Sequence, residues 1–537
     1  MQAAPSTATA FAPLRQPEFR MLWLVWLAAN LTLWMNDVAS AWLMTSLTDQ
    51  PYMVAMVQAS LTLPLFLLGL PSGALADIVD RRRYFALTHV WVAAVAIVLA
   101  GLSFGGALSA PLLLACSFAN GIGMAMRWPL FAAILPDLVR RDALSGALAL
   151  NGVAANLSRV VGPVIAGALI AGAGSEWVFL LNGALSVAAL ALILRWRPPP
   201  KTSALPGERL GGAMRRGLQH VLQSPRLRVI LLRIFLFFLQ TSALMALLPL
   251  VARRLDGGGP AAFTTLLAAL GAGAVLIAFK LESLRRRASR ASLVGAGICV
   301  HAAASAAVAL APNLWLAAPA AAVAGMAWIA TANSLTVAMQ LALPNWVRAR
   351  GMAIYQMAVM GGSAAGAALW GALATVASVQ AAIVSAAALG PLVFLLSRRR
   401  GVGGNFDEDL TPAAAAQVPP PVIAIGPHEG PVLVTIEYLI DPARAREFDA
   451  VMRQTRLARL RQGARAWGLF RDTARAGCYI EHFLDENWTE HQRRLERFTA
   501  ADIGLGQRRL AFHIGAAPPR TSRYVGAPDA GPGVPPL

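Results

Sequence analysis

The sequence predicts an all-α membrane protein with twelve transmembrane helices in two six-helix halves, followed by a C-terminal α+β cytoplasmic domain. Three observations support this fold class. Of the 537 residues, 57% are apolar and only 14% are charged, whereas a soluble domain carries about 25% charged residues. Long apolar runs recur from Phe19 to Ser397. After residue 430 these runs stop, and strand and amphipathic helix patterns replace them.

Each apolar run is long enough to cross about 30 Å of hydrocarbon as a helix. The predicted spans are residues 19–46, 52–76, 84–105, 109–131, 144–172, 177–195, 228–251, 262–281, 291–311, 314–340, 350–375 and 379–397. Their connections alternate between arginine-rich loops and loops nearly free of basic residues, with Arg253–Arg254 as the one exception. Basic residues stay on the cytoplasmic side, so we expect a multi-pass inner-membrane protein with both termini in the cytoplasm.

The net charge of +19 reflects these arginine-rich loops. The arginines follow the membrane loops rather than one face of a fold, so lipid is the expected partner and nucleic acid is not. The three cysteines and the seven histidines show no disulfide or metal spacing. No G-x-x-x-x-G-K-[ST] stretch is present, so direct ATP drive is not predicted. We therefore expect no cofactor.

The longest inner loop, Arg195–Arg228, separates the two halves, and an internal repeat supports this division. Leu135–Arg140 (LPDLVR) matches Leu343–Arg348 (LPNWVR), each at the end of the fourth span of its half. Parallel six-span repeats place a substrate site at their interface, near the membrane midplane. The predicted domains are a cytoplasmic N-terminus at 1–18, the halves at 19–195 and 228–397, a cytoplasmic linker at 196–227, a flexible linker at 398–430, a soluble domain at 431–517 and a Pro/Gly-rich tail at 518–537.

The soluble domain has the element order βαββαβ, which is typical of a ferredoxin-like fold. The predicted strands are Val432–Ile440, Ala466–Arg471, Cys478–Leu484 and Leu510–Ile514. The predicted helices are Pro442–Gln462 and Glu486–Phe498. Modules of this monooxygenase-like shape can be cofactor-free oxygenases or dimeric sensors. Since no catalytic set is visible, enzyme activity of this domain stays open, and dimerisation through it is an alternative.

Two segments carry motif spacing. After the second span the chain reads GALADIVDRRR, from Gly73 to Arg83. The fifth span contains SRVVGPVIAG, from Ser158 to Gly167. Small residues let helices pack closely, and a proline bends a helix. The alternatives are a solvated loop that only sets topology and ordinary small-residue packing.

These segments resemble two signatures of the major facilitator superfamily, G-x-L-x-D-R-x-G-R-R and G-x-x-x-G-P-x-x-G-G. The first resemblance implies an inner gate formed by Gly73, Asp77 and Arg81, while Ile78 and Asp80 depart from the pattern. The second implies a proton-driven exporter rather than an importer, and the matching residues are Gly162, Pro163 and Gly167.

The surrounding sequence resembles one bacterial branch of that superfamily. Asn120–Arg127, with Trp128-Pro129 after it, and the tail segments Val434–Tyr438 and Trp467–Asp472 carry the likeness. The branch includes enterobactin and macrolide exporters and transmembrane secretion effectors. The resemblance implies a transporter rather than an enzyme. This transporter would export a siderophore, a macrolide or a similar drug-like small molecule in exchange for protons.

Charges within the predicted spans are the candidate coupling groups. Asp37 lies about 17 residues into the first span, and Arg159 lies about 15 residues into the fifth. The two side chains are at similar depth, and the resemblance makes their spans neighbours. We expect a charge pair in which Asp37 titrates with protons. The alternatives are a static salt bridge, or an Asp37 that faces the outer vestibule.

Polar and aromatic residues of the spans are candidates for a substrate cavity, with Trp34 one turn from Asp37. The alternative is lipid-facing or interfacial aromatic residues. The cavity candidates are Asn30, Trp34, Asn36, Arg127, Tyr355 and Gln356. Two rival functions remain: an importer or facilitator without ion coupling, and a transporter whose soluble domain is a ligand sensor or an enzyme.

Overall fold

The computed structural model describes residues 12–139, 143–196, 210–287, 289–398, 409–413 and 420–526, apart from some helical side chains. The chain forms two compact units. The first comprises Met1–Leu205, Leu231–Thr336 and Tyr355–Val402. The second comprises Pro206–Ile230, Val337–Ile354 and Gly403–Leu537.

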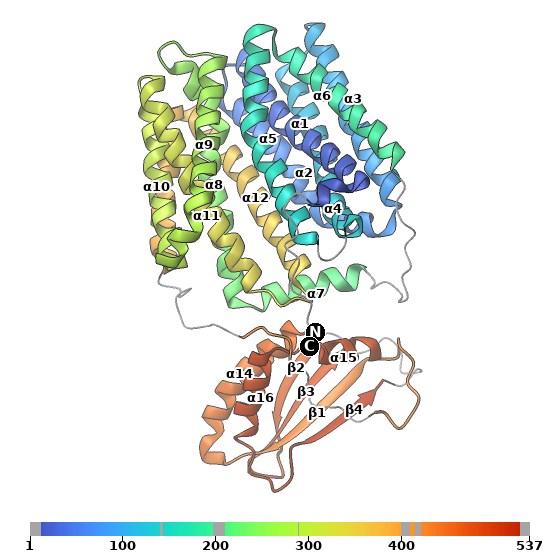
Figure 1. The fold of residues 1–537 in the computed structure, drawn as a ribbon. Coiled ribbons are helices and arrows are strands. Elements are labelled where there is room, and N and C mark those ends of the chain that lie inside the picture. Colours follow the sequence, from blue (N-terminus) through green and yellow to red (C-terminus); the bar gives the residue numbers. More distant parts are fainter. Residues whose placement is uncertain are drawn as a thin grey trace. The chain divides into compact units, whose positions relative to one another are not determined.

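Long helices make up the first unit and lie side by side as a bundle (Figure 1). Each predicted span coincides with one of them to within three residues, except that α4 and α9 extend seven and six residues beyond their predicted ends. The helices are α1 (Pro17–Leu47), α2 (Pro51–Ile78), α3 (Arg81–Phe104), α4 (Ala110–Leu138), α5 (Leu144–Gly172), α6 (Ser175–Arg195), α8 (Pro225–Arg254), α9 (Pro260–Arg287), α10 (Arg290–Leu310), α11 (Leu314–Leu341), α12 (Arg348–Val376) and α13 (Val379–Arg398). Nine helices of the described chain are long and apolar enough to cross a membrane.

Apolar side chains and close helix contacts hold this bundle together. The helix pairs α2–α4, α3–α6, α1–α5, α1–α6 and α10–α13 pack most extensively. The α5–α9 pair joins the two predicted halves. Near one end of that seam, the rings of Trp42 on α1 and Phe263 on α9 stack with centroids 5.9 Å apart. The two halves therefore share one apolar core, which contains Met44, Leu244 and Phe263 among others.

The second unit contains an antiparallel sheet of order β2-β3-β1-β4. Its strands are β1 (Val432–Leu439), β2 (Ala466–Arg471), β3 (Cys478–Asp485) and β4 (Arg520–Val525). Its helices are α14 (Ala445–Arg461), α15 (Trp488–Leu495) and α16 (Ala500–Leu510), after a short η2 turn (Pro442–Arg444). Figure 1 shows α14 and α16 along one face of the sheet.

The predicted strand at Leu510–Ile514 is wrong. Leu510 ends α16, whose start is fixed by a capping box between Thr499 and Asp502. The fourth strand is β4, which pairs with β1 from Val432–Val525 to Glu437–Arg520. The soluble domain therefore extends past the predicted boundary at residue 517, because an arginine-containing edge strand follows the two prolines Pro518 and Pro519.

An unpredicted helix, α7 (Leu210–Leu222), lies within the predicted linker at 196–227. This helix belongs to the second compact unit, together with the C-terminal domain and the junction between α11 and α12. Of the predicted linkers, residues 197–209, 399–408 and 414–419 lie outside the described residues, as does the predicted N-terminal segment up to residue 11.

Candidate functional site

A cavity at the seam of the two predicted halves brings together side chains from six helices. The space among its lining side chains is about 520 Å³, a volume that includes space open to the surroundings. The lining residues are Trp34 of α1, Arg159 and Pro163 of α5, Thr241, Leu244 and Met245 of α8, Leu267, Leu270, Gly271 and Ala274 of α9, His301 of α10 and Trp328 of α11. The lining is mostly apolar, and Arg159 is the charged residue among these lining residues.

The Arg159 guanidinium lies between two indole rings. Its Cζ atom is 5.4 Å from the ring centroid of Trp34 and 5.0 Å from that of Trp328. Cation–π attraction of this kind is worth roughly 0.5–2 kcal/mol. The Nε and Nη1 atoms are buried and form no hydrogen bond. Arg159 and Trp34, both predicted from the sequence, therefore share one cavity.

The expected charge pair between Asp37 and Arg159 is not formed in this structure. No ion pair or hydrogen bond joins the two side chains within the described part of the chain, because Arg159 is held against Trp34 and Trp328 instead. Asp37 is half-buried on α1, one turn beyond Trp34. It does not line the cavity.

A smaller cavity lies within the first six helices. It is lined by Thr32, Leu33, Asn36, Val92, Val95, Ala96, Asn120, Met124, Arg127 and Asn182. Arg127 is buried, and its Nη2 atom donates to the Ala29 carbonyl on α1 at 3.1 Å. The predicted cavity residues Asn36 and Arg127 thus occupy a different site from Trp34 and Arg159.

The remaining predicted cavity residues line neither of these cavities. Asn30 is buried and donates to the Trp26 carbonyl of its own helix at 2.8 Å. The Tyr355 hydroxyl is 2.9 Å from the hydroxyl of Thr336 on α11. Gln356 follows Tyr355 on α12 and is half-buried.

The predicted exporter motif lies on two helix contacts. A Cβ atom on Gly162 would come within 2.7 Å of the Trp34 Cβ, so this glycine allows α1 and α5 to approach closely. A Cβ on Gly167 would overlap Thr264 of α9 in the other half. Pro163 lines the cavity between these contacts. The motif therefore positions the helices around Arg159.

The predicted inner gate is only partly described. Gly73 and Asp77 belong to α2, but their side-chain surroundings lie outside the described residues. Arg81 is the first residue of α3. Asp80, which departs from the family pattern, caps this helix by accepting from the Arg83 backbone N–H at 2.8 Å.

The exceptional pair Arg253–Arg254 has a structural explanation. Arg253 donates to the Thr45 carbonyl in the last turn of α1. Arg254 donates to the Ala309 carbonyl in the last turn of α10, at 2.9 Å. Both arginines thus satisfy carbonyls at helix C-termini, where positive charge is favoured.

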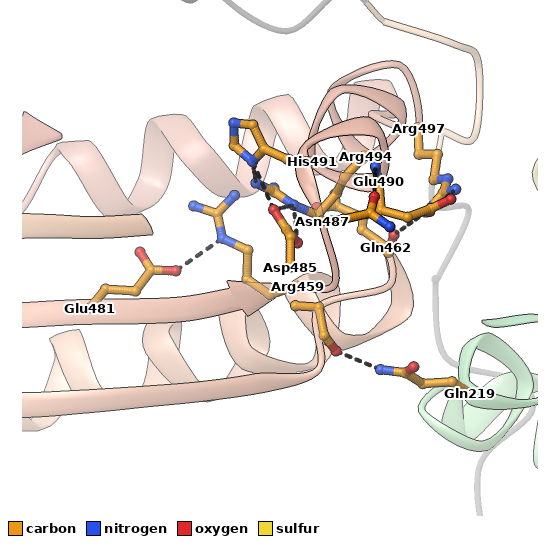
Figure 2. A network of polar contacts seen from close by, with 11 residues as sticks. Gln219, Arg459, Gln462, Glu481, Asp485, Asn487, Glu490, His491, Arg494 and Arg497 are labelled. Carbon is orange, nitrogen blue, oxygen red and sulfur yellow. Dashed lines mark hydrogen bonds and ion pairs between the residues drawn. The ribbon is translucent and has the colours of Figure 1, made fainter. Parts of the chain in front are cut away.

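The soluble domain contains a buried polar network on β3 (Figure 2). Glu481 accepts from Arg459 Nε at 2.9 Å, Tyr438 at 2.9 Å and Trp467 at 3.1 Å. Burial would raise the pKa of Glu481, but the charges of Arg459 and Arg509 and these hydrogen bonds outweigh it and hold the pKa at about 2. The Glu481 carboxylate is therefore charged at neutral pH.

A second carboxylate of the same strand completes the network. Asp485 accepts from His491 Nδ1 at 2.7 Å and from Arg494 Nε at 2.9 Å. His491 Nε2 and Arg494 Nη1 are buried without a hydrogen-bond partner. No group of three or more metal-ligating side chains occurs among the described residues. The network can fix helices on the sheet but contains no evident nucleophile.

Helix α7 docks on this domain through polar contacts. Arg215 and Arg216 reach Glu486 and Glu490, at 2.5 Å and 3.3 Å respectively. Gln219 donates to the Ala464 carbonyl at 2.7 Å, and Figure 2 shows this side chain pointing at the domain. His220 Nδ1 is 3.0 Å from the Arg461 carbonyl, and burial lowers the pKa of His220 to about 4. His220 therefore stays neutral at pH 7.

Trp346, in the junction between α11 and α12, completes this interface. Its ring lies 5.3 Å from the ring of His220, edge to face. The Arg497 guanidinium lies 4.7 Å from the same indole. Within the second unit, α7, which comes from the segment between the predicted halves, thus contacts the domain at the end of the chain.

Sequence reasoning missed His301, Thr241 and the whole α7 interface. His301 stands among alanines in an apolar span, and this contrast was the available signal. The apolar positions of α7, Met214, Leu218 and Leu222, have helical spacing that would have revealed an amphipathic helix.

Together, the helical bundle and its charged cavity define a transporter of the major facilitator superfamily, a multi-pass membrane protein rather than an enzyme. The chain belongs to the transmembrane secretion effector family, whose sequence profile matches residues 8–530. The resemblance inferred from the motifs is therefore confirmed.

Solved structures with a similar fold include the nucleoside transporter NupG, with a TM-score of 0.61 and 12% identity over 71% of this chain and 99% of that chain. A bacterial homolog of the human lysosomal transporter Spinster, in an inward-facing and occupied conformation, has a TM-score of 0.57 and 17% identity over 73% of this chain and 98% of that chain. At these identities the similarity concerns the fold alone.

Two curated relatives match shorter regions. The staphyloferrin A transporter of Staphylococcus aureus is 26% identical over 30% of this chain and 41% of its own length. The multidrug resistance protein MdtD of Cronobacter sakazakii is 29% identical over 29% of this chain and 32% of its own length. The matched region therefore spans less than half of each relative.

Proposed function

We propose that the protein exports a siderophore, a macrolide or a similar drug-like small molecule by proton antiport with alternating access. It does so across the cell inner membrane with twelve spans and both termini in the cytoplasm. The observation that carries this proposal is the seam cavity, because side chains of both halves line it around one arginine. The names of the two curated relatives, a siderophore transporter and a multidrug resistance protein, support the substrate range.

The motif contacts support the proposed moving parts. Gly162 and Gly167 sit where α5 meets α1 and α9, so a tilt of α5 changes the seam between the halves. In our proposal Pro163 lets the two ends of α5 move separately. Gly73, Asp77 and Arg81 form the inner gate that closes when the cavity opens outward.

Coupling requires a group that binds a proton in one state and releases it in another. We assign this role to Asp37, a half-buried carboxylate deep in a span and one turn beyond Trp34, which lines the cavity. Arg159 is held by the indoles of Trp34 and Trp328 in the present structure. In another state of the cycle it approaches Asp37 and keeps the carboxylate ionised.

The test starts by comparing compounds exported by a deletion strain and its parent. Transport of the compound that differs is then measured in inside-out vesicles with a pH gradient. Asp37→Asn should retain binding, since it mimics the protonated form, but should lose accumulation against the gradient. Asp49→Asn, in an exposed loop position, is the matched control and should pump normally. Uphill transport by Asp37→Asn at the parental rate would exclude Asp37, and gradient-independent transport by the parent would favour a facilitator.

The C-terminal domain is proposed to be a ferredoxin-like ligand sensor rather than an oxygenase. The docked helix α7 favours the sensor role, because α7 belongs to the segment between the two halves. Dimerisation through the domain is the alternative arrangement. Oxygen consumption by the full-length protein with a transported compound would contradict the sensor role.

A further inference from the structure

The seam cavity holds a positive charge whose neutralising partner is missing from the described chain. Arg159 lies among apolar side chains such as Leu244, Leu267 and Leu270. Two of its nitrogen atoms are buried and donate no hydrogen bond. An arginine remains charged in proteins, and an unpaired charge inside a membrane protein costs several kcal/mol. The cavity therefore has an unmet requirement for an anion.

The two tryptophans stabilise the cation without meeting this requirement. The centroids of Trp34 and Trp328 lie 5.4 Å and 5.0 Å from the Arg159 Cζ. An indole attracts a cation through its ring face, but it does not accept the strong in-plane hydrogen bonds of a guanidinium. These N–H groups form a planar fork that matches an oxyanion such as a carboxylate.

The other polar groups of the cavity do not supply the anion. His301 Nδ1 lies 3.1 Å from the Ala324 carbonyl, and its Nε2 lies 3.3 Å from the Ser305 hydroxyl. Because a carbonyl can only accept, Nδ1 donates, and the ring is occupied on both nitrogens. Thr241 is neutral, and Asp37 lies outside the lining. In this state no described side chain of the lining supplies the anion, so it must come from a ligand.

We infer that the seam cavity binds compounds in which a carboxylate is joined to an apolar or aromatic body, with Arg159 as the anion-binding residue. This inference rests on the proposed export function and names its substrate class. The indoles and the leucines contact the apolar body, while the guanidinium holds the acid group.

The test compares two probes that differ only in charge, 2-naphthoate and 2-naphthamide. Binding to the purified full-length protein is measured by equilibrium dialysis in a neutral detergent at pH 7. Wild type should bind the acid about tenfold or more tightly than the amide, as expected for a charge-assisted hydrogen bond. Arg159→Gln should reduce acid binding to the level of the amide. Equal binding of both probes by wild type, binding of neither, or an unchanged acid preference in Arg159→Gln would overturn the assignment.

Arg233→Gln is the matched control. Arg233 also lies over an aromatic ring, that of Phe394 at 5.7 Å, but it does not line the cavity. This variant should keep the acid preference. If Arg159→Gln does not fold, Thr241→Asp places a carboxylate in the same cavity and should weaken acid binding while sparing the amide. Thr241→Asn is its neutral counterpart and should bind the acid normally.

An anionic lipid could supply the same chemistry. Displacement of naphthoate by phosphatidylglycerol in mixed micelles would reassign the anion to a headgroup and overturn the substrate class. The proposed function fails separately. A wild type that prefers the acid but never accumulates substrate uphill contradicts the antiport. Uphill export without an acid preference contradicts only the anion site.

Discussion

Single residues on α5 decide how closely its neighbours approach. Gly162 and Gly152 stand on the same helix, yet a Cβ on Gly162 would meet Trp34 at 2.7 Å, whereas one on Gly152 would meet nothing within 4 Å. The same amino acid is therefore a packing requirement at one position and is replaceable at the other. Since Trp34 also holds Arg159, the Gly162 contact positions the cavity as well.

We expect Gly162→Leu to destabilise the bundle by about 1–3 kcal/mol, because the larger side chain forces α1 away from α5. It should also reduce binding in the seam cavity, since Trp34 moves with α1. Gly152→Leu should change neither property. Thermal unfolding of the purified protein and probe binding measure both effects. Equal melting temperatures for the two variants would contradict the close contact.

Glu481 is the residue on which the soluble domain's buried network converges, with a side-chain exposure of 0%. Glu481→Gln should destabilise β3 by about 3–5 kcal/mol at pH 7, because Arg459 keeps a buried charge without its partner. The pKa of Glu481 is lowered from 4.5 to about 2, so its charge stabilises the fold above pH 4.5 and this contribution is lost as pH falls towards 2. The difference between variant and wild type should shrink over that range.

Hydrogen exchange of β3 amides in the full-length protein measures this effect. Glu447→Gln is the control, because Glu447 forms an exposed pair with Arg444 and should change stability by less than about 1 kcal/mol. If the two variants exchanged at the same rate, the network would contribute no more than a surface pair.

Residue identity could be predicted from the sequence better than residue partnership. Arg159 and Trp34 were identifiable as an unusual charge and an aromatic side chain in apolar spans. Their contact with Trp328 was not, because it depends on how α11 of one half meets α1 and α5 of the other. The expected Asp37 partner was chosen by its depth and by the neighbouring spans that the resemblance implies, and neither fixes the direction in which a side chain points.

At the scale of elements, α7 shows what a polar linker can conceal. Its two arginines suggested only a cytoplasmic loop, but both contact acidic residues at the start of α15 and just before it. The strand β4 was missed for a similar reason, since its Arg520 and Arg523 and the prolines before it obscure the strand pattern. Edge strands tolerate such residues because one side remains unpaired.

The neighbours Arg215 and Arg216 provide a matched test of the α7 contact. The Arg216 side chain is 6% exposed and the Arg215 side chain is 50% exposed. Arg216→Gln should raise hydrogen exchange in α7 about tenfold or more, because Glu490 loses a buried partner. Arg215→Gln should raise it less than about fivefold, as for a surface pair. Comparable exchange in both variants would show that α7 is not held by the buried contact.

At the scale of the whole molecule, the arrangement of arginines carries the topology. Loops rich in arginine alternate with loops that lack it, and the repeat of LPDLVR and LPNWVR follows the same alternation. Arg253 and Arg254 are the exception to this alternation. Their role is structural, since they satisfy carbonyls of α1 and α10. A count of arginines alone could not have revealed this, because capping depends on which helix ends lie nearby.

Topology reporters test the twelve-span arrangement directly. Fusions after Arg83, Arg141, Arg290 and Arg400 should all report the cytoplasm, and a fusion after Gly106 should report the outside. A fusion after Gly258 should also report the outside, despite the two arginines before it. Replacing Arg253 and Arg254 with glutamine should leave this orientation unchanged but lower the melting temperature, because their role is to cap helices rather than to retain a loop in the cytoplasm. An inverted signal after Gly258 in the wild type would show that these arginines do set topology, and an external signal after Arg400 would exclude an even number of spans.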